Sequence, residues 1–148
     1  MIIGFELSLD KIQNILHQMH SHAKFNFILT GSRFFGHANI NSDYDFFVQS
    51  HKSDSDYINN YSEYELVDFL TKLGFYRHIE SSYLDNNTGD VYRYVPDKCS
   101  TIWIDVQIVY DAELKEKIQN KLKYYGWIMP KDKLSRILMW NLCYLMMS

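Results

Sequence analysis

The chain has few cysteines and no long hydrophobic run, and both shortages exclude whole classes of protein. Its two cysteines, Cys99 and Cys143, form no Cys-x-x-Cys pair, so we expect structural thiols in a reducing compartment rather than a disulfide framework. The longest apolar segment, 137–147, is interrupted by Asn141 and is too short to cross a bilayer. The N-terminus lacks the basic region and apolar core of a signal peptide. These absences predict a cytoplasmic protein with no membrane segment.

The chain also lacks a strong excess of either charge. Its formal net charge is −3, which argues against broad, non-specific binding to nucleic acid, since such binding needs a basic surface. No internal repeat and no low-complexity tract divides the 148 residues. We therefore expect a single domain over 1–148, with a core rich in the abundant aromatic side chains.

Hydrophobic periodicity predicts alternating helices and strands. Apolar residues at helical spacing, from Leu9 to Met19, predict a first helix that Ser8 would cap. Further helices are expected near 33 and over 62–73, 111–124 and 130–147. Strands are expected over 25–30, 44–49, 75–79, 91–95 and 101–110. The polar stretch 51–60 and the segment 85–90 are expected to be a loop and a turn.

Two of the expected strands separate an apolar side from an acidic side. In 101–110, the isoleucines and Val106 alternate with Asp105 and its neighbours, and in 44–49 Phe46 and Val48 oppose Asp45. Phe47 is the exception, because it is apolar on the acidic side. The pattern predicts an α+β fold with a mixed β-sheet, helices packed on one face and a carboxylate cleft on the other.

Asp43 and Asp45 follow a glycine-serine turn and stand one residue apart at the start of a strand. Side chains alternate along a strand, so the two carboxylates point the same way. Each raises the cost of ionising the other, and a hard cation such as Mg²⁺ relieves that conflict. Paired carboxylates beside a glycine turn are typical of phosphoryl or nucleotidyl transfer.

The whole segment resembles a known signature. The pattern Gly-Ser-Arg-x-x-Gly-x-Ala-x-x-x-Ser-Asp-x-Asp, which runs from Gly31 to Asp45, is similar to that of the DNA polymerase β-like nucleotidyltransferase superfamily, in particular its small minimal domains. Every defined position is filled. The family has a third carboxylate on a neighbouring strand, which Asp105 matches. The resemblance covers 27–109 and implies the nucleotidyltransferase fold.

The resemblance also implies roles for these residues. Asp43, Asp45 and Asp105 would be the catalytic residues and the ligands of Mg²⁺, or of Mn²⁺, and Asp105 would accept the proton of the attacking hydroxyl. Gly31 and Ser32 would approach the phosphates of a nucleoside triphosphate. Arg33 would neutralise phosphate charge or brace the loop, and both roles stay open. Arg93, on a strand near Asp105, is a further candidate for a phosphate contact.

The implied reaction transfers a nucleoside monophosphate, AMP from ATP in the first instance, to a hydroxyl acceptor and releases pyrophosphate. The acceptor classes of the family are RNA ends, proteins and small molecules, and the sequence does not choose among them. A homo-oligomer or a small helical partner protein is compatible with so short a chain. Two alternatives stay open: a non-catalytic nucleotide-binding or antitoxin-type module on the same fold, and a kinase-like phosphotransferase.

Overall fold

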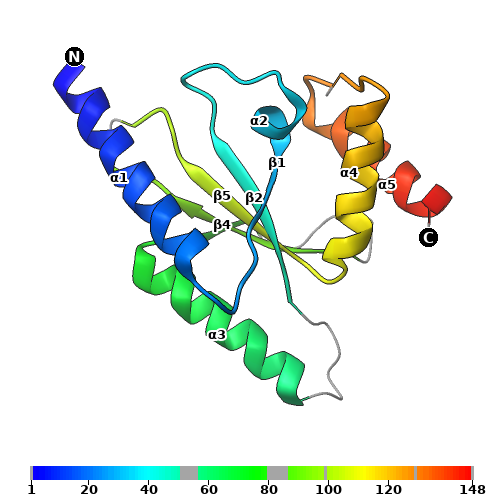
Figure 1. Cartoon of the computed structure of the whole chain (residues 1–148), viewed down its shortest axis with the longest axis horizontal. Coiled ribbons are helices and arrows are strands. Elements are labelled where there is room, and N and C mark those ends of the chain that lie inside the picture. Colours follow the sequence, from blue (N-terminus) through cyan, green and yellow to red (C-terminus); the bar gives the residue numbers. More distant parts are fainter. Residues whose placement is uncertain (1, 51–56, 80–86, 99, 129, 148) are drawn as a thin grey trace.

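A five-stranded mixed sheet forms the centre of the protein, with the strands in the order β1-β2-β5-β4-β3 (Figure 1). The structure is a computed structural model that describes residues 2–50, 57–79, 87–98, 100–128 and 130–147. Strands β2 and β5 are parallel, and every other neighbouring pair is antiparallel. The strands are β1 (Ile28–Thr30), β2 (Tyr44–Gln49), β3 (Tyr76–Ile79), β4 (Thr88–Tyr94) and β5 (Ile104–Val109).

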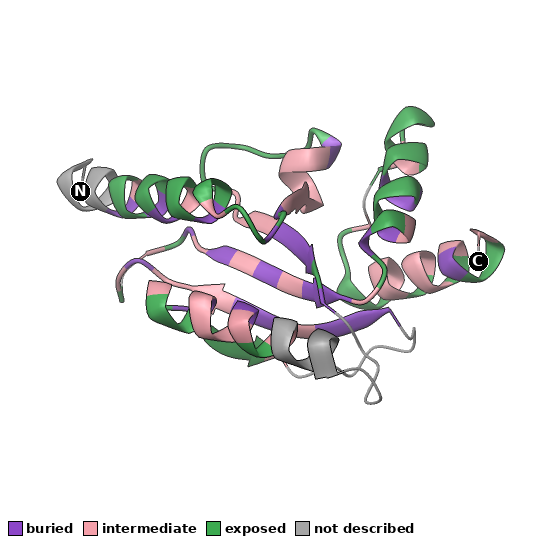
Figure 2. Cartoon of the chain, turned by 60° about the horizontal axis from the view of Figure 1, so that its bottom comes forward, coloured by how far each residue is buried: buried purple, intermediate pink, exposed green. Residues whose placement is uncertain are grey.

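The main core lies between one face of this sheet and two long helices. The helices are α1 (Ile2–Ser21) and α3 (Tyr57–Leu73), which lie side by side across that face (Figure 1). Their inward residues and the alternate residues of β2 and β5 are buried, and Figure 2 shows this alternation along the central strands. The fully buried members include Ile12, Met19, Leu66, Leu70 and Val106. The predicted apolar faces of the first helix and of the two Asp-bearing strands are therefore confirmed.

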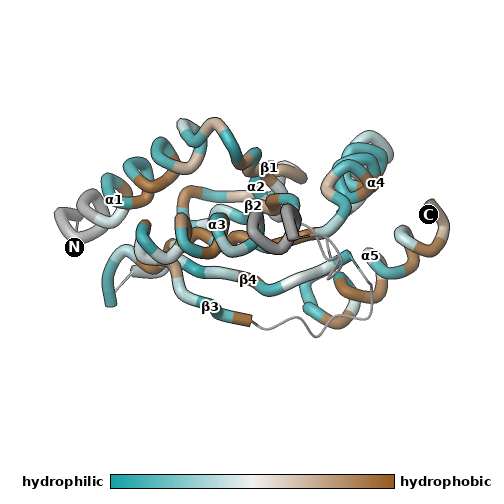
Figure 3. Tube along the Cα trace, turned by 90° about the horizontal axis from the view of Figure 1, so that it is seen from below, coloured by the Kyte–Doolittle hydropathy of each residue, from teal (hydrophilic) through white to brown (hydrophobic). Residues whose placement is uncertain are grey.

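A second, smaller core lies on the opposite face, which overturns part of the expected arrangement. Phe47 is fully buried there against Val109 and Ala112, the first residue of α4 (Ala112–Tyr124). Helix α5 (Lys133–Met147) packs beside α4, and both lie at the end of the sheet away from α1 (Figure 3). Helices thus cover both faces, and the prediction of helices on one face alone is wrong. Phe47 breaks the polar pattern of its strand because α4 covers it.

Several element boundaries differ from the expected ones: β1, β5 and α5 each begin three residues later than predicted, and three further differences concern α1, α3 and β4. Ser8 lies inside α1 rather than at its start, and its hydroxyl donates a hydrogen bond to the Asp97 carboxylate at 2.6 Å. Helix α3 begins at Tyr57, so the end of the expected 51–60 loop is helical, while 51–56 lie outside the described residues. Strand β4 begins at Thr88, inside the expected 85–90 turn, of which 85 and 86 are not described. In the part of the chain that the structure describes, no helix has the length and apolarity needed to span a membrane.

Candidate functional site

Four residues from four neighbouring strands stand in one row across the sheet. Thr30 of β1 pairs with Asp45 of β2, Asp45 pairs with Asp105 of β5, and Asp105 pairs with Arg93 of β4. Directly paired residues of adjacent strands point to the same face. The register therefore places the second carboxylate of the motif beside the third, on the face opposite the main core.

Gly31 permits the chain to turn close to Asp45. It follows β1 directly, has a φ of +70° and starts the short helix α2 (Gly31–Phe35). A Cβ atom at this position would collide with the carboxylate of Asp45. Two physical requirements thus favour glycine at this position: the left-handed backbone conformation and the close approach of the Asp45 carboxylate.

Asp45 is the most perturbed acid of the site. Burial raises the pKa of its carboxyl to about 7, and the nearby carboxylates of Asp105 and Asp43 add to the rise. Arg93 and Arg136 oppose it to a smaller extent. The charges of Asp43 and Asp105 therefore both act on Asp45, where negative charge is in excess.

Asp43 lies just before β2 and is hydrogen-bonded to Trp103, the residue just before β5. One of its carboxylate oxygens accepts a hydrogen bond from the Trp103 amide at 3.2 Å, and the Tyr44 amide donates to the Trp103 carbonyl at 3.0 Å. Burial raises the pKa of Asp43, the amide of Trp103 lowers it, and the charge of Asp105 raises it further. The backbone amide just before β5 thus orients the carboxylate just before β2.

Asp105 is held by a bidentate ion pair with Arg93. The guanidinium nitrogens donate to its two oxygens at 2.8 and 2.9 Å, and both side chains are 18% exposed. The guanidinium also lies over the indole of Trp103, 4.4 Å from the ring centroid. Arg93 therefore contacts the third carboxylate and also lines the cavity beside it, and the phosphate contact expected from the sequence stays a prediction.

Arg33 is engaged by the loop that carries the motif. Its guanidinium donates to the Ser42 carbonyl at 2.7 and 3.2 Å and lies 3.9 Å from the centroid of the Tyr44 ring. Its side chain does not line the cavity next to the carboxylates. In this arrangement Arg33 braces the loop, which is one of the two roles that the sequence left open for it.

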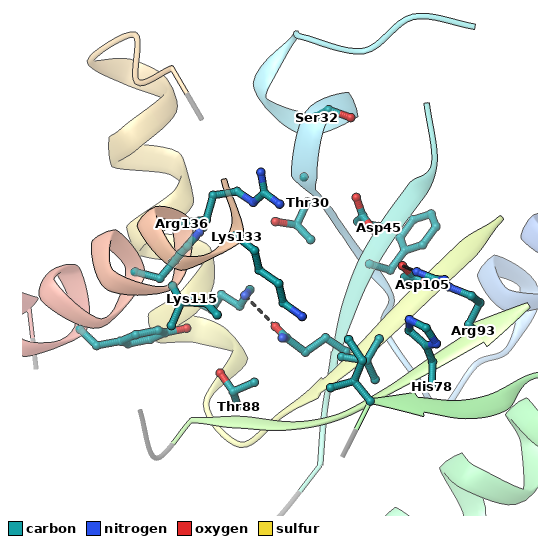
Figure 4. A pocket seen from close by; sticks show the side chains of 18 residues that line it. Thr30, Ser32, Asp45, His78, Thr88, Arg93, Asp105, Lys115, Lys133 and Arg136 are labelled. Carbon is teal, nitrogen blue, oxygen red and sulfur yellow. Dashed lines mark hydrogen bonds and ion pairs between the residues drawn. The ribbon is translucent and has the colours of Figure 1, made fainter. Parts of the chain in front are cut away.

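A cavity of about 560 Å³ opens beside Asp45 and Asp105. One wall comes from the strands and from Gly31 and Ser32, and the other comes from α4 and α5 (Figure 4). Sequence reasoning missed the cations of the second wall, Lys115, Lys133 and Arg136. Nothing in their local pattern distinguishes them from other helix lysines and arginines, and only the packing of α4 and α5 brings them to the cavity.

The carboxylate oxygens of the site are suitable ligands for a hard cation, although the three acids are not arranged around one common point. Carboxylate oxygens are the ligands that Mg²⁺ prefers, and the raised pKa of Asp45 marks charge that a cation would balance. Within the described ranges, no three Asp, Glu, His or Cys side chains are arranged to hold a metal ion. Both oxygens of Asp105 face Arg93, so a cation would have to compete with that guanidinium.

Comparison with known proteins adds no identification. No protein-family model, no curated protein and no solved structure matches the chain.

Proposed function

We propose that the protein is a divalent-metal-dependent nucleotidyltransferase that moves a nucleoside monophosphate, AMP from ATP in the first instance, to a hydroxyl acceptor. The observation that carries the proposal is the pairing of Asp45 with Asp105 on one face, next to Asp43 and the Gly31 turn. Sixty residues separate the two aspartates in the sequence, and a fold with no use for clustered acids gains nothing from bringing them together.

The proposed roles follow from these positions. Asp43 and Asp45 would hold Mg²⁺ or Mn²⁺, and Asp105 would be the third ligand, in competition with Arg93. The bound cation would polarise the α-phosphate and balance the charge of the leaving pyrophosphate. Asp105 then takes the proton of the attacking hydroxyl. Gly31 and Ser32, at the edge of the cavity, approach the phosphates.

The same geometry weighs on the alternative of a non-catalytic module. Such a module would be favoured if Asp105 pointed away from Asp45, whereas the register places the two side by side. A catalytic reading also explains why the sheet keeps an acid whose pKa is raised to about 7, because removal of that charge would ease folding. The acceptor, whether an RNA end, a protein or a small molecule, is the part of the reaction that an experiment must supply.

The test is incubation of the purified protein with each α-³²P-labelled nucleoside triphosphate, Mg²⁺ and a cell lysate. Transfer of label to an RNA, a protein or a small molecule, with release of pyrophosphate, is the expected result. The product separates the reaction classes, since a kinase would release ADP and a binding module would release neither product.

The matched controls are Asp43→Asn and Asp45→Asn, which keep the shape of the side chain and remove its charge. Both variants should fold and lose transfer by at least about 1,000-fold, since the proposed metal site depends on each carboxylate. Near-normal transfer by either variant would refute the proposed mechanism.

A further inference from the structure

Among the described residues that line the cavity, the charged side chains on the helix side are lysines and arginines. Among the residues that line the cavity, Asp45 and Asp105 are the two acids, and both lie on the strands. The same lining holds four lysines and arginines, of which Arg93 is neutralised by Asp105. The other three come from α4 and α5, which lie outside the segment 27–109 that resembles nucleotidyltransferases.

Lys115 is the fixed member of this group. It is 8% exposed, its ammonium donates to the Gln107 side-chain oxygen at 2.8 Å, and it lies 4.6 Å from the centroid of a Trp140 ring. The hydrogen bond turns the amide oxygen of Gln107 toward the lysine, so the NH₂ group of that amide remains as a second donor.

Lys133 and Arg136 are the outer members. They stand three residues apart in α5, which places them on one face of the helix, and Figure 4 shows both reaching from α5 toward the strands. The guanidinium of Arg136 also donates to the carbonyls of Pro130 and Lys131. Its positive charge lowers the pKa of Asp45 and so partly opposes the rise caused by burial. Lys133 is exposed, and within the described residues it forms no ion pair.

These three residues therefore offer hydrogen-bond donors and positive charge to a ligand in the cavity. Phosphate oxygens match such a wall, because lysine binds them as a point charge and arginine binds them through its fork of donors. A polyphosphate held by metal ions on the strand side would extend negative oxygens toward the opposite wall, which is where these cations lie.

We propose that Lys115, Lys133 and Arg136 form a phosphate-binding subsite on the helix side of the cavity. This proposal rests on the proposed function, because the subsite would hold phosphate groups opposite the carboxylates during nucleotidyl transfer. Two sources supply this chemistry: the triphosphate of the nucleotide and the phosphodiesters of a nucleic-acid acceptor.

The test measures binding to the full chain in EDTA, so that no metal ion bridges ligand and protein. Tripolyphosphate, ATP, adenosine and a 5′-hydroxyl RNA decamer are titrated by calorimetry against wild type, Lys133→Gln and Arg136→Gln. Lys131→Gln is the matched control, because it removes the same charge from an exposed lysine of the same segment that does not line the cavity. Lys115 stays intact because it is buried. Circular dichroism verifies that each variant is folded.

Tripolyphosphate should bind about fivefold more weakly to Lys133→Gln and to Arg136→Gln, and with unchanged affinity to Lys131→Gln. The same loss with ATP identifies the nucleotide as the source, and the same loss with the RNA decamer identifies the acceptor. Adenosine should show no difference among the proteins. Equal tripolyphosphate affinities for Lys133→Gln and Lys131→Gln would overturn the subsite.

The outcome stays separate from that of the proposed function. Loss of phosphate affinity in a protein that transfers no label would keep the subsite and refute the transferase. Intact phosphate affinity in Lys133→Gln and Arg136→Gln, in a protein whose transfer depends on Asp45, would keep the transferase and refute the subsite.

Discussion

At the scale of single residues, the site brings two neighbouring carboxylates together and partly neutralises them with one guanidinium. Asp45 is partly buried between Thr30 and Asp105, and a glycine leaves just enough room for its carboxylate. Arg93 offsets part of the accumulated charge by binding Asp105. Substitution at Asp45 or at Arg93 therefore tests each side of this balance.

Replacing Asp45 by Asn should stabilise the metal-free protein, and more so at high pH. The unfolded chain ionises this aspartate near its ordinary pKa of 3.8, whereas the folded protein keeps the proton up to about pH 7. Raising the pH across this interval favours the unfolded state, and the loss of stability is complete above pH 7. Urea unfolding in EDTA should show a gain on the order of 2–4 kcal/mol at pH 8 and a smaller gain at pH 5. A gain of equal size at both pH values would contradict the raised pKa.

Replacing Arg93 by Gln should tighten the binding of a divalent cation to the nucleotide-free protein. The substitution removes a positive charge from the site and frees both oxygens of Asp105. Electron paramagnetic resonance of free Mn²⁺ should report an affinity roughly three- to tenfold higher than that of wild type. Arg77→Gln on the neighbouring strand β3 is the control, since Arg77 lies 4.0 Å from the Asp90 carboxylate and outside the cavity lining. Unchanged or weaker Mn²⁺ binding by the Arg93 variant would show that the guanidinium does not compete with a metal ion.

At the scale of elements, the turn between β1 and α2 fixes where the motif can act. Gly31 is the first residue of the five-residue helix α2 and Gly36 directly follows its last residue, and both have positive φ. Their surroundings differ, because a Cβ at Gly31 would meet the Asp45 carboxylate while a Cβ at Gly36 would meet open space. The two glycines are therefore a matched pair with the same backbone requirement.

Gly31→Ala should cost more than Gly36→Ala in both stability and activity. The strained backbone alone costs about 1–2 kcal/mol at either position. At Gly31 the added methyl group must also displace Asp45, so we expect a larger loss of unfolding free energy and a loss of transfer that Gly36→Ala does not share. Thermal unfolding and the labelled-nucleotide assay measure the two effects. Equal losses in the two variants would mean that the close approach to Asp45 is unimportant.

Local patterns predicted the elements well where side-chain alternation was clear. Strand β2 has the bounds expected from its sequence, because the acidic and apolar residues of 44–49 alternate around a buried face. The pattern failed at Phe47, whose burial depends on α4, a helix that begins more than 60 residues later. It failed again at Ser8, where a hydroxyl typical of a helix cap instead bonds to Asp97 from inside α1.

At the scale of the whole molecule, the sequence predicted one wall of the cavity and missed the other. Strand alternation predicted that Asp43 and Asp45 share a face, and the family resemblance predicted Asp105 on a neighbouring strand. Of these three acids, Asp45 and Asp105 line the cavity. Lys115, Lys133 and Arg136 reach the cavity only because α4 packs over Phe47 and α5 packs beside α4. Long-range packing of this kind leaves no periodic trace in the chain.

The parallel pairing of β2 with β5 has a consequence for the order in which the molecule is made. Strand β5 enters the sheet between β2 and β4, both of which precede it in the chain. A nascent polypeptide that has left the ribosome only as far as β4 holds the first two aspartates but has no central strand to join its two halves. Closing such long loops is slow, and it is the step that places Asp105 beside Asp45. The Asp45–Asp105 charge conflict therefore arises only once β5, which follows the other four strands in the chain, has paired with β2.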